Sequence, residues 1–255
     1  MRTRCVLIAV MARFLIPATV AAQALETETS RLLARHSIEI GGNFEYQFSS
    51  EGRELALPFA IEYGITDRWE FLVEPVPYTG IRPKTGPSAT GQGDLEVTLT
   101  HRFLDERPGR PALSLAGEVK FPTAESRLIG TDVTDYTVYV IGSKRLGRVD
   151  LHANLGYAFL GQPTGVQIHD VINLALAGIL DLTPRTQAFA EVLGNTTASA
   201  EGNESGAGAE VAGGELSGTV GVRRLLGGNA AASLGVTYDN SGAVLLRPGM
   251  TLRLR

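Results

Sequence analysis

The sequence has a single cysteine, Cys5, and it lies close to the N-terminus. The rest of the chain therefore has no thiol for a disulfide, a cysteine metal site or a cysteine nucleophile. Beyond the N-terminus, no apolar run approaches the roughly 18 residues that identify a transmembrane helix, which excludes helical membrane spans. The basic residues are scattered and the formal net charge is -4, so we expect no surface for nucleic acid.

Residues 1–24 have the pattern of a secretory signal peptide. Arg2 and Arg4 form the positive start, Val6–Val20 is the apolar stretch, and Ala22-Gln23-Ala24 fits the small-x-small cleavage pattern. The alternative is an anchor helix, for which the stretch is too short. We therefore expect the mature chain to begin at Leu25 and to lose Cys5.

Residues 37–255 alternate apolar and polar side chains with a period of two, which is typical of β-strands. In the first run, Ile38, Ile40 and Phe44 fall on one face, and Glu39 and Glu45 fall on the other. Later runs with this pattern are 55–65, 95–103, 113–121, 149–159, 172–182, 186–194, 216–222, 232–238 and 246–254. Most have the length of about 9–11 residues that a tilted strand needs to cross a bilayer. Residues 25–36 carry mixed charges and are expected to form a short helix or a disordered lead-in.

Short and long connections alternate along the chain, as in outer-membrane barrels with short periplasmic turns and longer outer loops. The short ones are Thr66–Arg68, Gly147–Arg148, Thr183–Arg185 and Gly227–Asn229. The longer ones are 49–54, 79–92, 122–134, 160–168 and 195–214. The connection 104–110 is intermediate, and the last one, Asp239–Gly242, is short.

The register of one hairpin can be predicted in detail from its turn. If Gly147-Arg148 is a two-residue turn, Leu146 faces Val149 and the pairing continues to Tyr136 opposite Phe159. That face is apolar, whereas the other face pairs Arg145 with Asp150, Ser143 with His152 and Ile141 with Asn154. A single register thus sorts both strands into an apolar side and a polar side, as a membrane barrel requires.

Alternation alone does not separate a membrane barrel from a soluble sandwich or a lipocalin-like barrel, which would bury the apolar face. The signal peptide, the strand length and the alternating loops favour lipid outside, and aromatic residues near strand ends resemble interface girdles. These aromatic residues are Tyr63, Trp69, Tyr136, Phe159 and Tyr238. His101 falls on the lipid-facing side, near a strand end. The sequence therefore predicts an all-β, transmembrane, antiparallel up-and-down barrel of about twelve strands in contact with membrane lipids. The final residues, Leu252-Arg253-Leu254-Arg255, lack the C-terminal aromatic with which outer-membrane barrels usually close.

Several short motifs occur in an order that resembles a known family. They are Tyr63-Gly64-Ile65-Thr66-Asp67-Arg68-Trp69-Glu70, Gly93-Asp94-Leu95, Glu118-Val119-Lys120-Phe121-Pro122-Thr123, Thr134-Asp135-Tyr136, Ser143-Lys144-Arg145-Leu146-Gly147 and His152-Ala153-Asn154-Leu155-Gly156-Tyr157. Together they resemble the outer-membrane transporters named after the meta-pathway of phenol degradation, over nearly the whole mature chain. The resemblance implies a barrel and a role in the uptake of small compounds, with aromatic compounds as the expected class. It supplies no set of binding residues.

The polar face of the strands would line the lumen. The candidate lumen-lining residues are Glu62, Glu70, Glu74, Asp94, Glu96, Glu118, Lys120, Arg145, Asp150, His152, Asn154, Glu191 and Arg223. Arginines gather near the short turns, and most glutamates lie at the opposite strand ends and in the middle, so we expect one basic end and an acidic middle and opposite end. Mixed charges indicate an ion-paired network in a narrow or partly plugged lumen. The residues either line a solute path or only satisfy one another.

The sequence contains little that indicates a catalytic or metal-binding site. Ser143 opposite His152, with Asp150 nearby, has the composition of a nucleophile and its base, but no oxyanion donor is identifiable. The four histidines are scattered, and no phosphate-binding loop is present. We therefore expect no enzyme, no cofactor and no metal. The leading hypothesis is a channel or transporter for small-molecule solutes, with hydrophobic or aromatic compounds as the expected class. The alternative is a structural or ligand-binding barrel with a blocked lumen.

Overall fold

The computed structural model describes residues 25–165, 167–198 and 216–254. The predicted signal peptide, residues 1–24, lies outside the described residues, as does most of the predicted loop 195–214. Both therefore stay predictions from the sequence.

The described residues form strands and no helix, in one sheet of 16 strands. The strands are β1 (Ile38–Asn43), β2 (Glu45–Phe48), β3 (Gly52–Ala56), β4 (Phe59–Thr66), β5 (Trp69–Pro75), β6 (Thr79–Pro83), β7 (Ala89–Gly91), β8 (Leu95–Leu104), β9 (Ala112–Phe121), β10 (Asp135–Leu146), β11 (Val149–Phe159), β12 (Val171–Thr183), β13 (Thr186–Asn195), β14 (Leu216–Leu225), β15 (Ala230–Asp239) and β16 (Val244–Leu254). No helix in these residues is long and apolar enough to cross a membrane.

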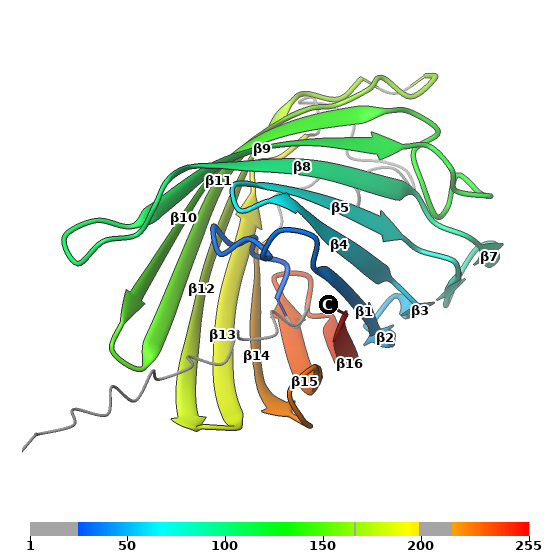
Figure 1. Ribbon diagram of the computed structural model, residues 1–255. Coiled ribbons are helices and arrows are strands. Elements are labelled where there is room, and N and C mark those ends of the chain that lie inside the picture. The colour runs from blue at the N-terminus through cyan, green and yellow to red at the C-terminus, as the bar shows by residue number, and fades with distance from the viewer. Residues whose placement is uncertain (1–24, 166, 199–215, 255) are drawn as a thin grey trace, which may run out of the picture.

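Twelve strands form a closed ring of antiparallel neighbours, in the order β1, β4, β5 and then β8 to β16. The ring closes where β1 pairs with β16, for example Ile38 with Leu254 and Asn43 with Gly249. Figure 1 shows the strands surrounding a common interior. Closure leaves none of these twelve strands as an open sheet edge, and the predicted barrel is confirmed.

A second tier of short strands extends one side of the ring. β2 pairs with β16 and β3, β3 pairs with β6, and β6 pairs with β7. The prediction of 79–92 as a loop is therefore wrong, and the predicted strand 55–65 is divided. Pro58 and Pro77 lie in the gaps, where proline lacks the N–H that a continuous ladder needs. Backbone hydrogen bonds such as that from Leu57 N to Tyr78 O (2.9 Å) link the chain across these gaps.

Apolar side chains point outward and polar ones point inward, the reverse of a soluble protein. Val140 and Leu155 are 48% and 55% exposed, whereas Ser143 and Asn154 are 1% and 5% exposed. The hairpin β10–β11 has the predicted register throughout, from Leu146 opposite Val149 to Tyr136 opposite Phe159. An exposed apolar belt around a buried polar interior is the arrangement of a barrel that faces lipid.

Aromatic side chains lie exposed near several strand ends. Tyr136, Phe159 and Tyr238 are among the exposed large side chains, and Trp69 stacks on His101 with ring centroids 4.3 Å apart. Rings of this kind suit the boundary between hydrocarbon and headgroups. Their contact with lipid stays a prediction.

Candidate functional site

The N-terminal segment, residues 25–36, lies inside the ring of strands rather than outside it (Figure 1). Thr27 donates hydrogen bonds from N and Oγ1 to Glu191 on β13, at 2.6 and 2.5 Å. Ser30 N donates to Ser143 Oγ on β10 at 2.9 Å, and Leu33 N donates to Glu70 on β5. The segment is neither a helix nor a disordered lead-in, because its backbone groups are bonded to distant walls of the lumen.

The segment crosses β4 just before it enters β1. His36 N donates to Gly64 O, and Gly64 N donates to Ser37 O at 3.0 Å. A Cβ atom at Gly64 would overlap the carbonyl oxygen of Ala34. Glycine at position 64 is therefore what allows the segment to lie against this wall.

Ion pairs attach the segment to the lumen wall at two places, one near the short turns and one at the start of the segment. Arg31 bridges Asp150 and Glu106, each at 2.7 Å, and Glu26 pairs with Arg247. Charge-assisted bonds of this type are stronger than neutral ones. They tie the segment to the polar interior of the barrel.

The predicted pair Ser143 and His152 is in register, with Oγ and Nδ1 2.9 Å apart. Ser143 Oγ also accepts the bond from Ser30 N and lies 3.2 Å from Thr29 Oγ1. The hydroxyl is fully occupied and buried under the N-terminal segment. This geometry serves to hold the segment and leaves no space for a substrate at Oγ.

A cavity of about 580 Å³ lies in the lumen beside the segment. Most of the predicted lumen residues line it, namely Glu62, Glu70, Glu74, Glu96, Glu118, Arg145, Asp150, His152, Asn154 and Arg223. Three predicted residues do not. Glu191 accepts hydrogen bonds from Thr27, and Lys120 forms ion pairs with Asp94 and Asp135 beside the loop 122–134. Whether the lining residues conduct a solute stays a prediction.

Sequence reasoning missed some residues of this cavity. Tyr139 lines it, and its ring lies over Gly156, where a Cβ would be 2.6 Å from the ring. The predicted register already placed Tyr139 on the polar face, so the signal was present. Glu28 was missed because its position depends on the fold: the Asn154 amide donates to its backbone oxygen and accepts from its backbone nitrogen, both at 3.1 Å.

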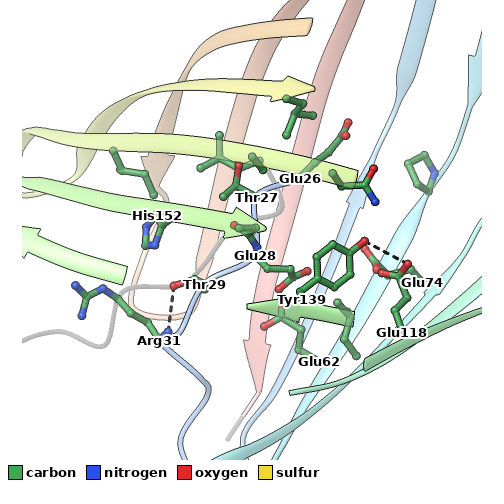
Figure 2. A pocket seen from close by; sticks show the side chains of 18 of the residues that line it. Glu26, Thr27, Glu28, Thr29, Arg31, Glu62, Glu74, Glu118, Tyr139 and His152 are labelled. Atoms are coloured by element: carbon green, nitrogen blue, oxygen red, sulfur yellow. Dashed lines mark hydrogen bonds between the residues drawn. The ribbon is translucent and has the colours of Figure 1, made fainter. Parts of the chain in front are cut away.

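The charges in the lumen are unevenly distributed. Arginines near the short turns have acidic partners, as in Arg145 with Asp181 and Arg68 with Asp105. Further from these turns the carboxylates predominate, and Figure 2 shows Glu28, Glu74 and Glu118 beside Tyr139. Burial, followed by the charges of Glu70 and Glu118, raises the pKa of Glu28 to about 8.

A closed antiparallel barrel with apolar exterior and polar interior is the fold of outer-membrane β-barrel proteins. No family model and no curated protein matches the sequence. Solved structures do match. An outer-membrane channel from Pseudomonas putida F1, named COG4313, has a TM-score of 0.67 at 12% identity, covering 90% of this chain and 100% of that chain.

Two porins are also similar in fold. The NanC porin has a TM-score of 0.61 at 10% identity, covering 84% of this chain and 100% of that chain. The KdgM porin, in complex with disordered oligogalacturonate, has a TM-score of 0.57 at 9% identity, covering 85% of this chain and 99% of that chain. At such identities the likeness establishes the outer-membrane barrel fold.

Proposed function

We propose that the protein is an outer-membrane channel for small solutes, whose bore is narrowed by the N-terminal segment. The observation that carries this proposal is the polar cavity of about 580 Å³ enclosed by an outwardly apolar barrel. That volume is within the range of sites for small molecules. The fold shared with outer-membrane channels and porins supports the same function and location.

The solute class that we propose is hydrophobic or aromatic compounds, following the resemblance to the transporters named after the meta-pathway of phenol degradation. Tyr139, Leu72 and Pro58 line the cavity and supply apolar surface for such a solute. The many carboxylates beside them favour a solute that also carries a positively charged group or a hydrogen-bond donor.

The N-terminal segment supports a second candidate function, a ligand-binding barrel with a blocked bore. The segment is bonded to β5, β10, β11 and β13, so it obstructs much of the lumen when docked. In this alternative the cavity retains its ligand and no solute crosses the membrane.

A reversible tether of the segment separates the two functions. Thr29 Oγ1 and Ser143 Oγ lie 3.2 Å apart, so cysteines at these positions are within disulfide reach after small shifts. We would prepare Thr29→Cys with Ser143→Cys in a Cys5→Ser background, and Thr29→Cys alone as the control. Conductance would be recorded in planar bilayers before and after a reducing agent is added.

The channel function predicts steady conductance in the reduced double variant and a lower conductance in its oxidised form, with no redox effect in the single variant. Equal conductance in both forms would mean that the segment does not narrow the path. The absence of conductance and solute flux in folded wild-type and reduced protein would refute the channel and favour the binding barrel.

A further inference from the structure

Five carboxylates on adjacent strands form what we call the acidic wall of the lumen. They are Glu62 on β4, Glu70 and Glu74 on β5, Glu96 on β8 and Glu118 on β9, and all line the cavity. Glu74 and Glu96 are direct cross-strand partners, and Glu118 is opposite Thr98, which follows Glu96 by two positions. Like charges directly opposite each other destabilise a sheet, so this arrangement requires compensation.

Several other lumen carboxylates form ion pairs with described side chains, whereas the members of the acidic wall form none. The compensated ones are Glu26 and Glu45 with Arg247, Asp150 with Arg31, Glu39 with Arg253, Asp181 with Arg145, and Asp94 with Lys120. Within the described residues, no ion pair involves a member of the acidic wall. Glu70 accepts a bond from Leu33 N, and Glu118 is bonded to the neutral hydroxyls of Thr98, Thr137 and Tyr139.

Glu39 supplies a second, independent observation. It is 1% exposed and points inward, and it is the cross-strand partner of Glu62. Its Oε2 bonds to Arg253 at 2.8 Å, whereas its Oε1 is buried and has no hydrogen-bond partner among the described residues. A buried carboxylate oxygen without a donor is costly, and this one lies beside the uncompensated wall.

The remaining surface of the cavity determines what kind of cation would fit. Tyr139 lies against the wall through its bond to Glu118, and Leu72, between Glu70 and Glu74 on β5, adds apolar surface. The described residues contain no group of three side chains with the geometry to hold a metal ion. A cavity of about 580 Å³ is also much larger than a metal ion. Carboxylates beside an aromatic ring suit an organic cation, which binds to both.

We propose that this cavity binds a small organic ammonium ion, with its charged nitrogen at the acidic wall and its hydrocarbon part against Tyr139 and Leu72. The proposal rests on the proposed function and names the solute class of that channel. The bound cation supplies the positive charge that the acidic wall lacks. Asn154 bonds the backbone of Glu28, which also lines this cavity.

The test is calorimetric titration of the folded protein in detergent micelles near neutral pH. Benzylammonium chloride is the charged probe, and benzyl alcohol is the neutral probe of similar shape. Glu74→Gln with Glu96→Gln removes the opposed charge pair of the wall. Glu51→Gln with Glu125→Gln removes two exposed loop charges and is the matched control.

We expect saturable binding of benzylammonium and none of benzyl alcohol. The wall variant should bind benzylammonium about tenfold more weakly or worse, since charge-assisted bonds are lost, and the loop variant should match the wild type. Equal binding of both probes by wild-type protein overturns the proposal without any variant. So does unchanged affinity in a folded wall variant, or displacement of benzylammonium by calcium at equal concentration.

This measurement does not depend on conductance, so the two proposals fail separately. A conducting barrel that shows no ammonium preference refutes the ammonium site and leaves the channel. A non-conducting barrel that binds benzylammonium refutes the channel and leaves the site as that of a binding barrel.

Discussion

Replacing Val140 with arginine tests which face of the barrel meets lipid. Val140 is the sixth of the 12 residues of β10, and it is 48% exposed between Leu115 and Leu155. A rise of about 3.3 Å per residue and a tilt of about 40° give the strand a span of about 30 Å along the membrane normal. That span equals the hydrocarbon thickness of a typical bilayer, which places Val140 near the midplane.

An arginine at the midplane of the lipid face costs about 2–4 kcal/mol. This lowers the folding equilibrium constant by a factor of roughly 30 to 1,000. Asn173→Arg is the matched control, because Asn173 lines the polar cavity on β12. There an arginine meets water and carboxylates, and we expect it to change the free energy by less than about 1 kcal/mol.

The assay is reversible unfolding by urea in lipid vesicles, followed by the mobility shift between unheated and heated protein. The reasoning fails if Val140→Arg folds as stably as the wild type, or if Asn173→Arg is equally damaging. Either result would mean that the apolar face does not meet hydrocarbon.

Two further predictions concern docking of the N-terminal segment, measured as the mobile fraction of a nitroxide on Leu25→Cys in a Cys5→Ser background. Gly64→Ala should weaken docking by about 1–3 kcal/mol, because the added Cβ overlaps Ala34. Gly117→Ala is the control and should leave docking unchanged, because the space around a Cβ at position 117 is empty. Equal mobile fractions in the two variants would contradict this reasoning. Glu28 has a pKa of about 8 when docked against 4.5 in solvent, so the docked state binds more protons between these values. The contribution of Glu28 to docking should therefore be fully present below about pH 4.5 and be lost as the pH rises to about 8, and Glu28→Gln should remove this contribution. A mobile fraction with the same pH profile in both proteins would exclude Glu28 as the cause.

The barrel wall could be predicted because each strand carries its own local pattern. Period-two alternation assigns Val140 to one face and Asn154 to the other, and a two-residue turn then determines the register of the whole hairpin. The strands β6 and β7 escaped prediction because they are short and follow Pro77. Their pairing depends on β3, which no local pattern in 79–92 encodes.

The candidate site was predictable only in part, for a related reason. The wall residues of the lumen, such as Glu74 and Arg223, follow from the same alternation. The N-terminal segment has no period-two alternation, and its hydrogen-bond partners are far away in sequence, with Thr27 and Glu191 separated by 164 positions. Its place in the lumen results from polar complementarity in the closed barrel, which appears only after the ring has formed.

The N-terminal segment makes both attractive and repulsive electrostatic contacts along its length. Glu26 and Arg31 are held by opposite charges on the lumen wall, whereas Glu28, between them, faces Glu70 and Glu118. When Glu28 is ionised, two attractive anchors thus hold a repulsive centre in place, and the bonds from Asn154 fix the backbone of Glu28 in the lumen. A segment bound in this way docks more weakly than its ion pairs alone suggest, and a change of charge at the acidic wall alters its docking directly. A cation at the acidic wall would reduce the repulsion on ionised Glu28, so a solute of that charge and the segment would stabilise each other in the lumen at a pH where Glu28 is charged.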